Sequence, residues 1–219
     1  MKALLKRLLP SPLQLLLVKS PLIFALRRQW IRWFGRKIVA TETSKARIRR
    51  EQEGFFEKYC QGLGLDIGFG GDLVSPNARG WDIEHGDAMS LDGLRDESFD
   101  FVYSSHTLEH MPDLAMALKN WWRVVKPGGY LILYVPHRDL YEKKIELPSR
   151  WNLDHKHFFL PNKDEAPATT GVLPLLQRSI QGFELIYLRV CARGHTITDP
   201  LLHSNGEYSI EAVLRKEQR

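Results

Sequence analysis

From residue 63 onward, hydrophobic positions gather in short runs that are separated by polar and glycine-rich segments. Short apolar runs bounded by turn residues are typical of buried strands. We predict strands over residues 63–67, 79–83, 99–105 and 130–135. These four runs form the first part of a predicted sheet.

Between the last two runs, "MPDLAMALKNWWRVVKPGG" has helical spacing, with apolar residues at 114, 118, 121 and 125. The segment Lys126–Gly129 predicts the end of this helix, and Trp121 and Trp122 are predicted core residues. Near the end of the chain, residues 183–192 and 207–216 are two β-rich segments. The fold class predicted is α/β, a Rossmann-like doubly wound sheet, mostly parallel, with a C-terminal antiparallel strand pair.

Residues 1–40 differ from this pattern, since they contain nine Lys and Arg and no Asp or Glu. The segments "SPLQLLLVK" and "SPLIFALRR" each begin with a Ser-Pro helix start. In the second, Leu22, Leu26, Trp30 and Trp33 follow one helical face. We predict a basic amphipathic helical arm over 1–40, which either lies on an anionic membrane surface or packs on its own domain or a second subunit.

Residues 41–61 are predicted to form a charged connecting helix, and residues 62–219 one domain, because 219 residues allow one full-sized core. The connecting helix is expected to dock through Phe55, Phe56 and Tyr59. Cys60 and Cys191 are the only cysteines and lie far apart, which favours a reducing compartment. Residues 1–60 carry 14 Lys and Arg and 4 Asp and Glu, whereas residues 61–219 carry 17 Lys and Arg and 22 Asp and Glu. The domain itself is therefore acidic.

The stretch "LGLDIGFGGD" combines a strand and glycine turn with carboxylates. The dinucleotide fingerprint G-x-G-x-x-G fails, because Leu73 stands at its sixth position, and no G-K-[ST] follows for a P-loop. Asp66 and Asp72 flank the turn where a pyrophosphate would lie and would repel it. S-adenosylmethionine fits better, because it carries an ammonium and a sulfonium. Asp82 is then placed for the ribose hydroxyls and Asp87 with Ala88 for the adenine edge.

With "DIGFGGD", "GWDI", "GDA" and "SFDFVYSSHTLEHMPD…RVVKPGGYLILYVPH" in order, residues 55–219 resemble class I S-adenosylmethionine-dependent methyltransferases of the type 11 kind. One departure is Asp72, where the family pattern has glycine. The short segment that follows, with Pro76, predicts an abbreviated first helix. The resemblance implies S-adenosylmethionine as cofactor and the following cofactor-binding residues: Asp66, Gly68, Phe69, Gly70, Asp82, Asp87, Ala88, Ser105 and His106.

A histidine is the natural base for removing a hydroxyl proton near neutral pH. The catalytic candidates are His137, His155 and His157, which follow the fourth strand in a substrate-side insertion over 137–170. Aromatic residues alternate with Asp, Asn and His there, which suits a sugar. The segment "DHKH" contains residues that can bind metals, Asp154, His155 and His157. The sequence shows no further ligand at a spacing typical of metal sites, so we predict no metal site. For Glu109 and His110, local capping is as good an interpretation as a direct role.

Similar insertions accompany methyltransferases linked to bacterial surface-polysaccharide synthesis. We therefore expect O-methylation of a glycan or lipid-linked saccharide, in the cytoplasm or on the inner face of the cytoplasmic membrane. The alternatives are a quinone or small-lipid methyltransferase and a non-catalytic binding subunit. Nucleic acid is not an expected partner, because "SSHT" replaces the [DNS]-P-P-[YFW] signature and the domain is acidic. The acceptor is expected to be a small molecule or glycan.

Overall fold

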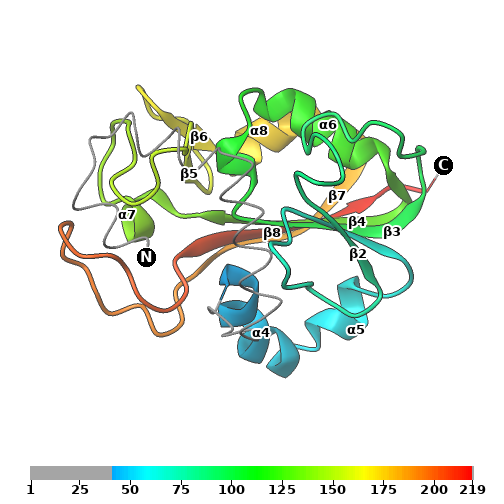
Figure 1. The fold of residues 1–219 in the computed structure, drawn as a ribbon, viewed down its shortest axis with the longest axis horizontal. Coiled ribbons are helices and arrows are strands. Elements are labelled where there is room, and N and C mark those ends of the chain that lie inside the picture. Colours follow the sequence, from blue (N-terminus) through cyan, green and yellow to red (C-terminus); the bar gives the residue numbers. More distant parts are fainter. Residues whose placement is uncertain (1–40, 219) are drawn as a thin grey trace. The chain divides into compact units, whose positions relative to one another are not determined.

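The structure is a computed structural model that describes residues 41–218. The arm predicted for residues 1–40 lies outside the described residues, so both interpretations of it stay predictions. The described chain contains a six-stranded sheet and a two-stranded sheet with helices around them (Figure 1). The elements are α4 (Glu42–Gln52), α5 (Phe55–Tyr59), β1 (Gly64–Ile67), β2 (Ala78–Trp81), β3 (Phe99–Ser105), η1 (Leu108–His110), α6 (Leu114–Arg123), β4 (Val125–Pro136), α7 (Arg138–Tyr141), β5 (Phe158–Leu160), β6 (Thr169–Gly171), α8 (Val172–Ser179), β7 (Phe183–Cys191) and β8 (Ser209–Lys216).

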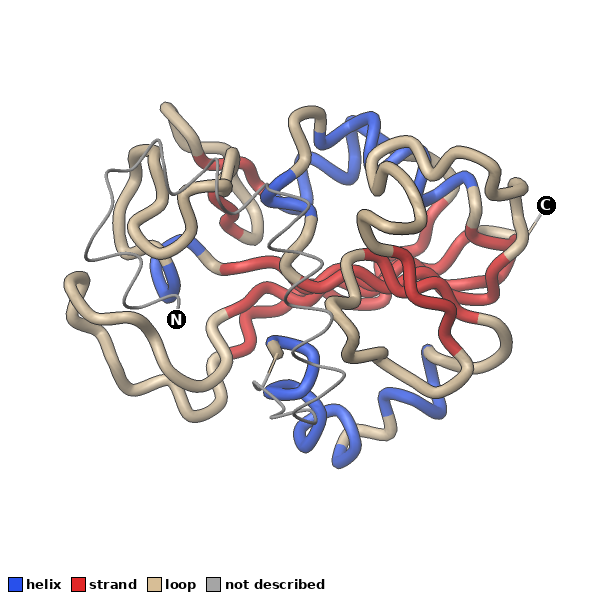
Figure 2. The backbone as a smooth tube through the Cα atoms, in the orientation of Figure 1, coloured by secondary structure: helices blue, strands red, loops and turns tan. Residues whose placement is uncertain are grey.

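The large sheet has the strand order β2-β1-β3-β4-β8-β7, and its strands run between the two groups of helices (Figure 2). The first four strands are parallel, β8 runs antiparallel to β4, and β7 runs antiparallel to β8. The predicted doubly wound sheet with a C-terminal antiparallel pair is therefore confirmed. Strand order reverses between β1 and β3, and ligands of such sheets bind outside the carboxyl ends of the strands at this switch point.

Helices cover both faces of the large sheet, α6 and α8 on one face and α4 and α5 on the other (Figure 1). Strand β3 therefore alternates between two cores: Phe101 and Tyr103 pack with Phe55 of α5, whereas Val102 packs with Trp121 of α6. Trp121 and Trp122 are both buried, as predicted. In the described chain, the segment between β1 and β2 contains no helix. The first helix, which was predicted to be short, is therefore absent from this segment. The segment before β1 covers that face instead.

Two boundaries differ from those predicted. The connecting segment forms two helices, because the chain turns at Gly54, whose φ of 62° is left-handed. The segment Lys126–Gly129, predicted to end the helix that spans residues 114–125, lies within β4, since α6 ends at Arg123 and β4 begins at Val125. Residues 126–129 belong to β4 because the register between β3 and β4 shifts there, which accommodates extra residues beside Phe101.

A buried ion cluster joins α4 to the sheet. Glu211, the third residue of β8, is fully buried and binds three guanidinium groups, which belong to Arg49, Arg50 and Arg189. Arg50 is fully buried too and lies over the rings of Phe55, Tyr103 and Tyr134, with 4.7–5.1 Å from the guanidinium carbon to the ring centroids. Burial alone would raise the pKa of Glu211, but the arginines lower it to about 2.

We expect Glu211→Gln to lower the free energy of unfolding by about 3–5 kcal/mol, because it leaves buried guanidinium charge without its partner. Urea unfolding at pH 7 measures this. The depressed pKa means that the stabilisation by Glu211 is present above its ordinary value of 4.5 and is lost as pH falls toward 2. The difference between the two proteins should therefore shrink in acid.

Arg178→Gln is the matched control. Its ion pair with Asp164 is also short, at 2.9 Å, but both side chains are about half exposed, so its loss should cost no more than about 1 kcal/mol. Equal stabilities for wild type and Glu211→Gln at pH 7 would contradict the role given to the cluster.

Candidate active site

The glycine turn after β1 lies where the sequence analysis places the cofactor. Gly68 and Gly70 have φ values of 74° and 58°, which non-glycine residues rarely adopt. A Cβ on Gly68 would overlap the side chain of Thr107, which follows β3, whereas one on Gly71 would meet no atom within 4 Å. The turn is therefore packed against β3 on one side and open on the other, which leaves room for a ligand.

Asp82 follows β2 and faces this turn. Its carboxylate accepts a hydrogen bond from the amide of Gly70 at 3.2 Å and one from the amide of Ile83 at 2.9 Å. Phe69 lies over Gly80 of β2, where a Cβ would strike the ring at 2.6 Å. The ends of β1 and β2 are thus held together around the residues predicted for the cofactor.

Asp72 is directed away from this ligand side. Its carboxylate accepts hydrogen bonds from the hydroxyls of Thr41 and Ser44, and Arg47 lies 3.9 Å away. These three residues belong to the start of α4 and its N-cap. The aspartate at the position of the family glycine therefore fastens the turn to α4.

Asp66 is a buried carboxyl on β1. It is 1% exposed and accepts a hydrogen bond from the amide of Val74 at 2.7 Å. Burial raises its pKa to about 7, since desolvation outweighs that bond. A cationic ligand group beside Asp66 would favour its charged form, so this residue fits the ammonium of S-adenosylmethionine.

The loop predicted to meet adenine is held by α6. The carbonyl of Ala88 accepts a hydrogen bond from the indole nitrogen of Trp121 at 2.7 Å, and the carboxylate of Asp87 accepts one from the amide of Met89 at 2.9 Å. Trp121 is therefore both a core residue and a support for this loop. Its second role requires the contact between α6 and residue 88, which helical spacing does not reveal.

Ser105 ends β3, and His106 follows with a strained φ of 50°. The Nε2 atom of His106 lies 2.8 Å from the hydroxyl of Ser209, and its ring packs among Tyr134, Tyr141 and Tyr208. Burial lowers the pKa of His106 well below its ordinary value, so the imidazole is neutral at pH 7. A neutral imidazole does not repel a sulfonium.

The three catalytic candidates lie in different surroundings. His137 caps α7, accepting a hydrogen bond from the amide of Asp139 at 3.2 Å. The Nε2 atom of His157 lies 3.1 Å from the carbonyl of Met111. His155 is buried, with Nδ1 2.6 Å from Glu142 and Nε2 3.7 Å from Glu109. Of the three, His155 is the one packed among other ionisable side chains.

Several residues around His155 were not singled out by the sequence analysis. They are Glu142 of the insertion and His203 and Tyr208 of the loop before β8. Tyr141 precedes Glu142 in the chain and packs against the other two rings. Its ring centroid lies 4.9 Å from that of Tyr208 and 5.4 Å from that of His203. The sequence alone did not predict that these residues lie together, because they are far apart in the chain. Only the antiparallel pairing of β8 with β4 brings Tyr208 beside His137.

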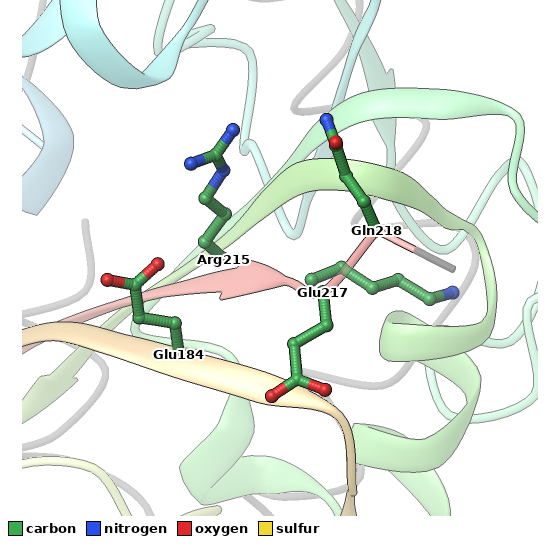
Figure 3. A pocket seen from close by; sticks show the side chains of 5 residues that line it. Glu184, Arg215, Glu217 and Gln218 are labelled. Atoms are coloured by element: carbon green, nitrogen blue, oxygen red, sulfur yellow. The ribbon is translucent and has the colours of Figure 1, made fainter.

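A hollow lined by Glu184, Arg215, Lys216, Glu217 and Gln218 lies elsewhere (Figure 3). It lies at the start of β7 and the end of β8, and Arg215 pairs with Tyr130 near the beginning of β4. This is the edge of the sheet opposite the glycine turn. None of the predicted site residues lines it, so it is not part of the candidate active site.

Comparison with known proteins finds similarity to methyltransferases. Residues 28–133 match a family described as "Methyltransferase domain". The demethylmenaquinone methyltransferases of Staphylococcus haemolyticus (strain JCSC1435) and Staphylococcus aureus (strain JH9) are each 48% identical over 50 residues. These matches cover 23% of this chain and 20% of the relatives, so the chain spans about a fifth of the length of the curated relatives that it matches.

Two solved structures are similar in fold. A SAM-dependent methyltransferase from Archaeoglobus fulgidus is 18% identical, with a TM-score of 0.51, 87% of this chain covered and 99% of that chain. A second structure comes from work on the conversion of a disulfide bond into a thioacetal group during echinomycin biosynthesis. It is also 18% identical, with a TM-score of 0.52, and the match covers 78% of this chain and 80% of that chain. The fold of the described chain is therefore similar to the class I methyltransferase fold, and the match of residues 28–133 to a methyltransferase domain implies S-adenosylmethionine as the cofactor.

We expect the affinity for S-adenosylmethionine to fall about tenfold between pH 7 and pH 5.5, because Asp66, with its pKa of about 7, becomes protonated over this range and no longer attracts the ammonium. Calorimetric titration at several pH values measures this. Asp66→Asn should bind more weakly at pH 7 and show little dependence on pH.

Asp92→Asn, which changes an exposed carboxylate, should retain the pH dependence of the wild type. An equally steep dependence in Asp66→Asn would assign the proton to another group.

Proposed function

We propose that this chain transfers the methyl group of S-adenosylmethionine to a hydroxyl of a saccharide, with a lipid-linked glycan as the acceptor. Methyl transfer is an in-line displacement, so the enzyme must align the acceptor with the sulfonium methyl and remove a proton. The chain supplies a cofactor turn at the ends of β1 and β2. The acceptor then approaches from the carboxyl end of β4, where the insertion begins.

The observation that carries the saccharide proposal is a group of aromatic and histidine rings at this end of the sheet. The ring centroid of His203 lies 5.3 Å from that of Trp151 and 5.4 Å from that of Tyr141. Asp154 and Asn152 lie in the same insertion. Aromatic faces beside hydrogen-bonding groups suit sugar rings, which have both apolar C–H faces and hydroxyls.

Exposed leucines and isoleucine support a lipid-linked acceptor. Leu201 and Leu202 are 71% and 54% exposed, and Ile145 is 53% exposed. The ammonium of Lys143 joins the two segments, since it donates to the carbonyls of residues 197, 199 and 202 at 2.7–3.1 Å. Exposed apolar side chains beside basic ones are typical of protein surfaces that contact lipids. The membrane-surface localisation stays part of this proposal.

A quinone acceptor is the second candidate, because the matched curated relatives are named demethylmenaquinone methyltransferases. Their similarity extends over 50 residues only. The polar groups around Trp151 and His203 favour the saccharide, since a quinone ring requires a more apolar pocket. Among the described residues, no helix is long and apolar enough to cross a bilayer.

The acceptor is tested with S-adenosylmethionine carrying a labelled methyl group. A lipid-linked oligosaccharide fraction from bacterial membranes and a short-chain demethylmenaquinone are offered separately. We expect label in the saccharide, recovered as a methyl ether of a sugar after acid hydrolysis. Label in the quinone alone would replace the saccharide by the second candidate.

The double variant Leu201→Ser and Leu202→Ser tests the lipid-linked part of the proposal. Its rate on the lipid-linked fraction should fall about 30–1000-fold, because each leucine contributes roughly 1–2 kcal/mol when buried in an apolar phase, which is about 2–4 kcal/mol for the pair. The rate on the same saccharide released from its lipid should be unchanged. Equal loss on both acceptors would point to a damaged site and not to lost lipid contact.

Of the predicted bases, we propose His155 for removing the acceptor proton, because Glu142 orients its ring. His155→Ala should lower kcat by about 10²–10⁴ while leaving the affinity for S-adenosylmethionine unchanged. His195→Ala, which changes a histidine bonded to the carbonyl of Leu140, is the control. A kcat for His155→Ala within twofold of the wild type would remove this role.

A further inference from the structure

Three potential metal ligands meet beside the proposed acceptor site. Glu109 and His110 belong to η1 after β3, and His155 comes from the insertion. One ligand atom of each lies within 4.8 Å of the others, and the Nε2 atom of His155 is 3.7 Å from Oε1 of Glu109. Ligands of one ion at bond lengths of about 2.0–2.2 Å lie roughly 3–4 Å apart, so small side-chain movements would close this group around an ion.

The carboxylate of Glu109 has no hydrogen-bond partner in another described residue. The side chain is fully buried. The nearest basic groups are imidazoles, with Nδ1 of His106 at 3.6 Å and Nε2 of His155 at 3.7 Å. An unpaired buried carboxylate is costly and rare in native proteins. A cation bound here would supply the missing charge.

Both histidines are oriented by their Nδ1 atoms. That of His155 lies 2.6 Å from Glu142, whose other oxygen accepts a hydrogen bond from Ser149 at 2.6 Å. That of His110 lies 3.2 Å from the carboxylate of Asp154. Each ring thus keeps Nε2 for another ligand. A carboxylate behind the imidazole is the usual arrangement around metal-binding histidines, because it fixes the ring and increases its basicity.

We propose that Glu109, His110 and His155 bind one divalent transition-metal ion of the zinc class. Two imidazoles and one carboxylate favour such ions over Mg²⁺ and Ca²⁺, which prefer oxygen ligands. Three protein ligands leave a coordination position open. This site departs from the sequence prediction of no metal, which considered His155 with His157 and lacked the ligands from η1.

The inference rests on the proposed function only for the role of the ion. An acceptor hydroxyl bound at the open position would have a lowered pKa, so its proton would pass to water and the oxygen would become a better nucleophile. His155 would then promote loss of the acceptor proton by holding the ion, in place of the direct contact with the hydroxyl proposed above, and a lowered kcat of His155→Ala is expected for either role. Binding of the metal itself is measurable without any acceptor.

The test uses the untagged full chain, freed of metal by a chelator and titrated with Zn²⁺ by calorimetry. We expect one equivalent of Zn²⁺ to bind. Glu109→Gln should weaken binding at least tenfold, and Glu142→Gln by about 10–100-fold, because the second substitution loosens His155. His195→Gln should bind as the wild type. Cys60 and Cys191 are buried and offer no competing thiol site.

Co²⁺ provides a second measurement. The wild type should develop visible absorption bands of a site with nitrogen and oxygen ligands, and His155→Gln should lose them while keeping the far-ultraviolet circular dichroism of a folded chain. Absence of stoichiometric Zn²⁺ and Co²⁺ binding by the wild type would overturn the inference even if every variant were unstable. Binding that Glu109→Gln and His155→Gln both leave unchanged would also overturn it.

Methylation assays separate this inference from the proposed function. Metal-free protein that methylates the saccharide at the full rate, together with a wild type that binds no Zn²⁺, would refute the metal site and leave the function standing. Stoichiometric Zn²⁺ binding without methylation of any saccharide would support the site and refute the function.

Discussion

The neutralisation of Glu211 is the constraint on which the rest of this domain depends. A carboxylate on β8 cannot be buried alone, and the guanidinium groups that neutralise it come from α4 and β7. Satisfying this charge therefore brings the segment before the first strand onto the sheet. The segment between β1 and β2 has no helix and leaves one face of the sheet uncovered. Helix α4 covers that face.

The sheet was predictable because its signals are local. Short apolar runs and the glycine turn identify β1, β3 and the two C-terminal strands, and their order along the chain allows few topologies. The errors have local causes too. The left-handed Gly54 divides the connecting helix, and the start of β4 at Val125 was hidden because Lys126–Gly129 resembles a helix stop.

The candidate site was predictable only in its cofactor half. There the residues lie at the ends of consecutive strands, so residues that follow one another along the chain also lie close together in space. The acceptor half is assembled from η1, the insertion and the loop before β8, which are separated by tens of residues. The unpaired burial of Glu109 and its approach to His155 depend on this assembly, and capping was an equally good interpretation of the sequence alone.

Asp72 joins two parts of the chain at one carboxylate. Thr41 is both the N-cap of α4 and a hydrogen-bond donor to Asp72 in the glycine turn, and Ser44 donates to the same carboxylate. The start of α4 and the glycine turn therefore cannot shift independently of each other. The residue that departs from the family's glycine pattern thus makes the position of the turn depend on the position of α4.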